Sequence, residues 1–316
     1  MAQHGWRSRV NSILIPAALS AALLLLIYCA DASAQMFRYL DASGNIVPAS
    51  GSMLYQPKTH VSGGGDMTLT SYRVSTGALL PVNDKLRFGL GLVYEFNDYN
   101  FSRLEGFAVP DPWNKTHRVG LAPMILYKLQ PEWNLFLSPV AEYSAEQGAD
   151  FGKSLMYGGV VGAFYQAKPN LRIGFAAGVF YRLEQTVVFP SLLISWKITD
   201  QLRLGNTNRL GPAGPAGLEL SYTPVRNWEV GVGAGVRSNR FRLDSNGPVP
   251  SGIGQNTSAP VYARIGHRLG RHFLVDVYGG AAFGGSLRLE DRRGNEIDRV
   301  NYNVAPIMGL TLSAFF

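Results

Sequence analysis

The sequence is poor in cysteine and in long apolar runs. Cys29 is its only cysteine, and beyond residue 34 there is no apolar stretch of the roughly 18 residues that a membrane-spanning helix needs. A chain with one cysteine cannot carry a disulfide framework. These two absences exclude a disulfide-rich scaffold and a bundle of membrane helices.

Charged side chains are also scarce, at 16% of the residues, and the formal net charge is only +7. Domains that bind nucleic acids concentrate a denser positive charge on one face. We therefore expect no nucleic-acid partner.

The N-terminus has the organisation of a secretory signal peptide. Arg7 and Arg9 form a basic segment, residues 13–30 are apolar, and Ala32-Ser33-Ala34 is a cleavage site of the A-x-A type. The bulky Tyr28 before Cys29 argues against lipidation. We expect residues 1–34 to be removed, against the alternative of a retained membrane helix, so that the mature chain has no thiol chemistry.

The mature sequence alternates apolar residues with small ones. In residues 85–96 and 228–237 one face carries Leu86, Phe88, Leu90, Leu92, Tyr94 and Phe96, and then Trp228, Val230, Val232, Ala234 and Val236. The opposite face carries glycine with isolated charges, such as Gly89, Gly231, Glu95 and Glu229. Strand side chains alternate between faces. An apolar face opposite a glycine-rich face is typical of a barrel wall between lipid and a lumen.

Short turns alternate with longer connections along the chain. Turns are expected at residues 82–84, 130–132, 168–170, 199–201, 224–226 and 270–271, and longer connections at 99–114, 147–152, 211–215, 244–257 and 290–298. The segment 66–316 holds thirteen strand candidates. One further strand within residues 35–65 returns both termini to one side. We predict an all-β, single antiparallel transmembrane β-barrel of 14 strands, or 12 if short segments at 201–210 and 216–223 are miscounted.

The chain ends on a strand that closes with Phe316, with Met308, Leu310, Leu312 and Ala314 on one face. This ending resembles the signal by which the barrel assembly machinery recognises bacterial outer-membrane β-barrels. The mature chain resembles outer-membrane barrels of the porin-like class. Residues 189–200 and 217–222 are similar to uncharacterised barrels grouped as a domain of unknown function. The resemblance implies the Gram-negative outer membrane, with its lipids and lipopolysaccharide as partners, and implies no catalytic or binding residues.

Charged residues on the inward face are the candidate functional residues. By strand parity these are Arg87, Glu95, Arg118, Lys128, Glu142, Arg172, Arg182, Glu184, Arg203, Glu219, Glu229, Arg237, Arg264, Arg268 and Asp276. They either pair across strands to neutralise a closed interior or select polar or anionic solutes in a water-filled pore. The sequence therefore favours a passive pore, with a non-transporting structural barrel as the alternative.

Two connections differ in character. Residues 244–257 are rich in Gly, Pro, Ser and Asn, and we expect them to be mobile and exposed. The connection 99–114 carries Phe101, Leu104, Phe107, Val109 and Trp113. We predict that it folds inward and narrows the lumen, against the alternative that it extends a hairpin above the membrane.

Catalytic, metal and cofactor sites are not expected. His60 and Ser62 could approach each other on one strand face, as in a surface lipid hydrolase, but Gly63-Gly64-Gly65 follows and no orienting acid is evident. The histidines at 4, 60, 117, 267 and 272 are scattered and lack the spacing of a metal site. The glycine pairs carry no phosphate-loop lysine.

Overall fold

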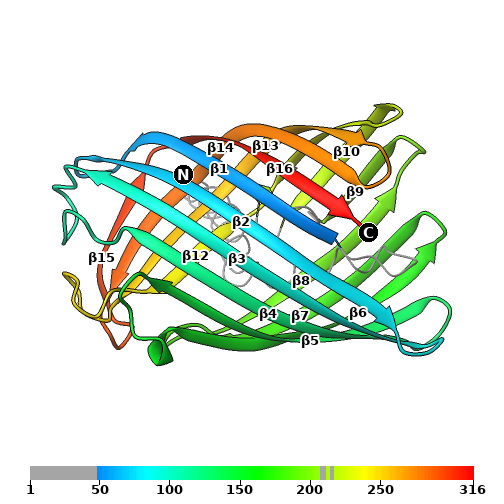
Figure 1. The fold of residues 1–316 in the computed structure, drawn as a ribbon, viewed down its shortest axis with the longest axis horizontal. Helices are drawn as coiled ribbons and strands as arrows, with labels where there is room; N and C mark the ends of the chain where they lie inside the picture. The colour runs from blue at the N-terminus through cyan, green and yellow to red at the C-terminus, as the bar shows by residue number, and fades with distance from the viewer. Residues whose placement is uncertain (1–47, 207–210, 214–216) are drawn as a thin grey trace, which may run out of the picture.

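A computed structural model describes residues 48–206, 211–213 and 217–316 as a closed antiparallel β-barrel (Figure 1). The strands are β1 (Pro48–His60), β2 (Asp66–Pro81), β3 (Leu86–Ser102), β4 (Lys115–Lys128), β5 (Trp133–Glu146), β6 (Leu155–Lys168), β7 (Leu171–Tyr181), β8 (Thr186–Lys197), β9 (Leu202–Asn206), β10 (Leu218–Val225), β11 (Trp228–Ala234), β12 (Arg237–Arg242), β13 (Ile253–Leu269), β14 (Phe273–Glu290), β15 (Glu296–Tyr302) and β16 (Ala305–Phe315). A single turn of 3-10 helix, η1 (Gly152–Ser154), precedes β6. The signal peptide predicted at residues 1–34 lies outside the described residues.

Over the described residues the barrel wall has fourteen strands, as the sequence predicts. β11 and β12 are two parts of one wall strand, and so are β15 and β16, because each pair lies along the same neighbour, β13 or β14. Pairing of β1 with β16, from Pro48↔Phe315 to Tyr55↔Met308, closes the wall. The first strand is therefore β1, within the segment 35–65 where it was expected.

The two ends of the barrel differ. Short turns follow β2, β4, β6, β8, β10 and β13 at the end that also carries Phe315, which we call the turn end. The connections after β1, β3, β5, β7, β12 and β14 lie at the opposite end, which we call the loop end. In Figure 1 the C-terminus marks the turn end on the right, and β15 lies toward the loop end on the left.

The outward face of the wall is apolar. Large exposed side chains on successive strands include Val74, Phe88, Leu90, Leu92, Val119, Leu121, Leu135, Leu137, Phe175, Val179, Val230, Val232, Val261, Ile265, Val277, Leu310 and Leu312. The residues between them point inward, and Glu95 on β3 is fully buried. No helix in the described part of the chain is long and apolar enough to cross a lipid bilayer.

At the loop end the wall narrows. β12 pairs with β13 along one edge, and at Arg242↔Ala145 its other edge meets β5. On the other side, Val61 after β1 bridges to Tyr302 of β15. The strands β12, β13, β14, β15, β1, β2, β3, β4 and β5 thus form a smaller nine-strand ring. Because barrels of about eight strands are filled by their own side chains, this ring closes the loop end.

Two expectations about this region are wrong. Val236, expected on the lipid face, is buried, because β11 ends at Ala234 and the chain then turns into the ring. Residues 253–257, expected in a mobile exposed loop, belong to β13, and Ile253 and Gln255 are buried between β12 and β14.

Candidate lumen site

Glu95 is the centre of a cluster of arginines inside the barrel. Arg73 on β2 donates from Nε to Glu95 Oε2 at 2.7 Å, and Arg118 on β4 donates from Nη2 to the same oxygen at 2.5 Å. Arg237 on β12 donates from Nη2 to Glu95 Oε1 at 3.0 Å. One buried carboxylate therefore holds three guanidinium groups from three strands.

Arg237 spans the interior to make this contact. Its Nη2 also donates to Ser71 Oγ at 2.8 Å and to Asn97 Oδ1 at 3.2 Å. Ser71 and Asn97 lie on β2 and β3, which β13, β14, β16 and β1 separate from β12 around the wall. The side chain is thus a bridge between two sectors of the wall.

A second cluster has the opposite balance of charge. Arg264 on β13 donates from Nη1 to Asp276 Oδ1 at 2.9 Å and from Nη2 to Glu219 Oε1 at 2.5 Å, and Nη2 also contacts Glu229. The hydroxyl of Tyr262 donates to Glu219 Oε2 at 2.8 Å. One arginine here faces three carboxylates.

The two clusters place opposite excess charges on different sectors of the lumen wall. The arginine-rich cluster lies on β2, β3, β4 and β12, with Glu142 of β5 at 4.0 Å from Arg118. The carboxylate-rich cluster lies on β10, β11, β13 and β14. An excess of positive charge on one sector and of negative charge on another produces an electric field across the space between them. Rings of charged side chains in pores distinguish solutes by such fields.

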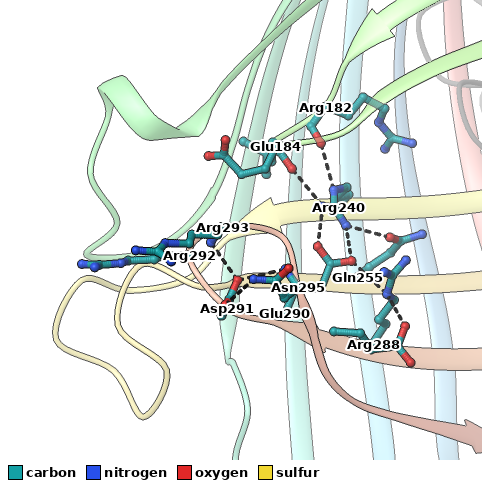
Figure 2. Close-up of polar contacts among 12 residues, drawn as sticks. Arg182, Glu184, Arg240, Gln255, Arg288, Glu290, Asp291, Arg292, Arg293 and Asn295 are labelled. Carbon is teal, nitrogen blue, oxygen red and sulfur yellow. Dashed lines mark hydrogen bonds and ion pairs between the residues drawn. The ribbon is translucent and has the colours of Figure 1, made fainter.

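Arg240 fixes the nine-strand ring from inside. Its Nη2 donates to Glu290 Oε2 at 2.5 Å and to the Leu183 carbonyl at 2.8 Å, and its Nε donates to the Arg182 carbonyl at 2.9 Å. Gln255 accepts from Nη1 at 3.1 Å. Figure 2 shows this guanidinium between the Glu290 carboxylate and the backbone after β7. The arginine thereby joins β12 to β14 and to the β7–β8 connection.

Arg242, two residues further along β12, makes the corresponding contacts nearer the loop end. Its Nη2 donates to Glu184 Oε1 at 2.7 Å, and its Nε donates to the Lys153 carbonyl at 2.9 Å. Burial raises the pKa of Glu184, but hydrogen bonds from Arg242 and Tyr181 outweigh burial, so the pKa lies below its ordinary value. Glu184 is therefore ionised at neutral pH and holds β12 against the β7–β8 connection.

The connection predicted to fold inward carries three deeply buried side chains. Leu104, Phe107 and Trp113 are 1%, 6% and 3% exposed. Trp113 packs edge-on to Phe241 of β12, with ring centroids 5.3 Å apart, and edge-on to Phe101 at 5.6 Å. That these residues narrow a conducting lumen stays a prediction.

The remaining predicted inward charges lie nearer the turn end or at the β7–β8 connection. Three of them, Arg87, Lys128 and Arg172, line a common cavity. Arg182 is buried and donates to the Ser238 carbonyl at 3.4 Å, and Arg203 donates to Ser195 Oγ at 3.4 Å. Arg268 is exposed at the turn end of β13.

Arg288 Nε lies 2.8 Å from Glu290 Oε1 and extends the contacts of Arg240 along β14. Sequence reasoning missed five charged residues of these networks: Arg73, Arg240, Arg242, Arg288 and Glu290. Strand parity was enough to find Arg73, which alternates with the exposed Tyr72 and Val74. Arg240 and Arg242 flank Phe241, but nothing in that alternation shows that both faces of β12 are buried.

The His60–Ser62 segment lies at the loop end. The expectation that no acid lies nearby is wrong: Asp66 Oδ1 is 3.6 Å from His60 Nδ1, because His60 and Asp66 are paired in register. Lys58 Nζ lies 3.0 Å from Oδ2 of the same carboxylate. Within the described residues, no hydrogen bond joins Ser62 to His60.

Three other histidines, all in the described part of the chain, lie beside aromatic rings. His267 lies against Trp228 with ring centroids 4.3 Å apart, and His117 lies against Phe96 at 5.1 Å. His272 lies beside the C-terminal Phe316 at 6.4 Å. In the described ranges, no group of three or more histidine, cysteine, aspartate or glutamate side chains could hold a metal ion.

Comparisons with known proteins bear on the fold. A family model described as Domain of unknown function (DUF6268) matches residues 32–313. The structure is similar to a Pseudomonas aeruginosa FadL homologue, with a TM-score of 0.51 and 14% identity over 92% of this chain and 95% of that one. It is also similar to the COG4313 outer membrane channel from Pseudomonas putida F1, with a TM-score of 0.47 and 9% identity over 87% and 96% of the two chains. No curated protein matches the chain in sequence.

Proposed function

The chain belongs to the family described as Domain of unknown function (DUF6268), and from its barrel we propose an outer-membrane channel for small polar or anionic solutes, held closed by its own side chains. The apolar outward face supports insertion in a bilayer, because a lipid-facing wall must present apolar residues at every second position. Outer-membrane barrels place short turns in the periplasm. We therefore assign the turn end to the periplasm and the loop end to the cell exterior.

The bridge from Arg237 to Glu95 is the observation that carries the proposal. A fourteen-strand wall encloses more space than one of about eight strands, which side chains just fill. Buried ion pairs contribute little to stability compared with apolar packing. Charges in the middle of the lumen are therefore better explained by a polar path for solutes than by a need for stability.

The nine-strand ring favours a second candidate, a structural barrel that transports nothing. The ring is filled by the side chains of residues 101–113 and of β12, and its arginines are paired with carboxylates. A sealed loop end is compatible with a structural protein and with a closed channel. The two differ in whether the seal can open.

Entry of solutes into vesicles separates the two candidates. Purified protein is reconstituted into liposomes, and swelling is measured with gluconate, glucose and glucosamine, which are similar in size and differ in charge. The proposal expects protein-dependent swelling, and the rate should be higher with gluconate than with glucosamine. Vesicles with Arg237→Ser should swell faster than vesicles with the wild-type protein. Swelling at the protein-free rate for both proteins would favour the structural barrel.

Assembly and surroundings form part of the same proposal. The C-terminal strand β16 completes the wall between β1 and β14, and Phe316 is 67% exposed at its end. An exposed terminal aromatic supports recognition by the barrel assembly machinery. Lipids and lipopolysaccharide of the outer membrane are the partners that the apolar wall would contact.

A further inference from the structure

A cavity of about 300 Å³ lies at the turn end of the barrel, inside strands β3 to β7. Its lining residues come from five strands, β3 to β7, and from the β2–β3 and β4–β5 turns. The volume is at the lower end of the roughly 300–1,000 Å³ that small-molecule sites occupy. The cavity is thus large enough for a small organic molecule.

The charges around the cavity are nearly all positive. Lys85, Arg87, Lys128 and Arg172 line it, and Asp84 is the one carboxylate among its lining residues. Clefts lined by one sign of charge concentrate ions of the opposite sign. Two guanidinium groups among the four cations favour carboxylate or phosphate, which they bind through paired hydrogen bonds.

One side of the cavity is held in place by the β6–β7 turn. Gln166 donates from Nε2 to the Lys168 carbonyl at 2.6 Å and to the Leu171 carbonyl at 3.3 Å. Its Oε1 accepts from Arg172 Nε at 3.2 Å. Because the backbone fixes Gln166, and Gln166 in turn holds Arg172, this guanidinium is positioned in advance of binding, which reduces the entropy lost on binding.

The floor of the cavity is apolar. Leu126 and Phe164 line it, and both are buried members of the apolar cluster that continues inward along β4 to β8. An inorganic ion would make no apolar contact with these two side chains. A ligand with a charged head and an apolar body would satisfy both parts of the cavity.

We propose that this cavity binds a small amphiphilic anion, a carboxylate or phosphate ester carried on an apolar body such as an aromatic ring. The inference rests on the proposed function for its biological role, since it names the class of solute that the periplasmic mouth of the channel would hold. Binding at the cavity needs no opening of the lumen. The two proposals can therefore fail separately.

Calorimetric titration of the protein in lipid nanodiscs tests the site. The probes are phenyl phosphate, benzoate, benzyl alcohol and inorganic phosphate. We expect phenyl phosphate and benzoate to bind at least about tenfold more tightly than the neutral alcohol, and phenyl phosphate to bind more tightly than inorganic phosphate. Arg172→Gln and Arg87→Gln should each weaken binding of both aromatic anions about tenfold or more, because each removes a charge-assisted hydrogen bond.

Arg226→Gln is the matched control, since Arg226 is exposed in the β10–β11 turn at the same end and does not line the cavity. Lys128→Gln, at an exposed lining residue, replaces any arginine variant that does not fold. Equal binding of benzoate and benzyl alcohol would overturn the proposal, and so would equal losses in Arg226→Gln and the lining variants. Binding without vesicle swelling would keep the site and reject the channel, whereas swelling without binding would reject the site alone.

Discussion

Arg237 of β12 donates a 3.0 Å hydrogen bond from Nη2 to Oε1 of Glu95 on β3, across the interior of the barrel. Glu95 is fully buried and holds two more arginines, so the bridge rests on a fixed acceptor. Strand β12 carries this bridge at the loop end, where it pairs with β13 along one edge and meets β5 at the other. In the proposed channel, the closed state therefore depends on the position of this short strand.

The pair of Arg240 and Glu290 should be important for stability. Both side chains are 1% exposed. Glu290→Gln leaves the guanidinium buried without its counter-charge, and we expect a loss of about 3–5 kcal/mol in the free energy of unfolding. Urea unfolding in vesicles measures it. Asp200→Asn is the control, because its pair with Lys197 is solvent-exposed and should contribute little to stability. Equal losses would contradict the assignment.

Acid should loosen the contact between β12 and the β7–β8 connection. The pKa of Glu184 is lower in the folded state than its ordinary value, so its contribution to stability is present above about pH 4.3 and is lost as the pH falls through the lowered pKa. Hydrogen exchange of residues 182–185 should be slower in the wild type than in Glu184→Gln at pH 7.

The difference in exchange should shrink below pH 4, when the wild-type carboxyl becomes protonated. Comparing the two proteins at each pH removes the intrinsic effect of pH on exchange. A difference that stays constant with pH would show that the charge of Glu184 is not what holds the connection.

If the wall lies in lipid, introducing a charge should cost different amounts of stability at two exposed apolar residues. Leu92 is 42% exposed midway along β3, and Val82 is 61% exposed in the β2–β3 turn. Leu92→Arg should destabilise the barrel by about 2–4 kcal/mol and Val82→Arg by about 0–1 kcal/mol, because the cost of charge falls from the bilayer midplane to the interface. Similar costs in unfolding from vesicles would place the outward face in water.

The inward-folded connection gives a further prediction. Removal of residues 104–109 takes Leu104 and Phe107 out of the apolar packing of the nine-strand ring. We expect the remaining barrel to conduct more ions in planar bilayers, because the ring then no longer fills its own interior. A well-folded deletion variant with unchanged conductance would show that these residues only support the hairpin above the membrane.

Much of the fold could be predicted from local pattern. The alternation of apolar and small residues around Phe88, Leu90 and Leu92 identifies lipid-facing positions, because each side chain of a wall strand faces either the lipid or the lumen. The fourteen strands follow from the turns and from the need to return both termini to one end. These features depend on residues that are near one another in the sequence.

The parts that could not be predicted depend on distant pairings. Arg242 meets Ala145 of β5, and Arg237 reaches Ser71 of β2. No periodicity in β12 indicates that its second edge meets β5, because a strand of the nine-strand ring and a lipid-facing strand alternate in the same way. Parity identified Arg237, Glu95 and Arg264 as inward candidates but could not show which of them meet.

Single-channel conductance of Arg237→Ser tests the central claim, that the lumen is a solute path closed by the bridge to Glu95. Purified wild type, Arg237→Ser and the control Arg226→Ser are compared in planar bilayers at several salt concentrations. The account predicts larger, salt-dependent conductance steps for Arg237→Ser and the same behaviour for wild type and Arg226→Ser. A folded Arg237→Ser protein that is silent, or that conducts no more than the wild type, would contradict it.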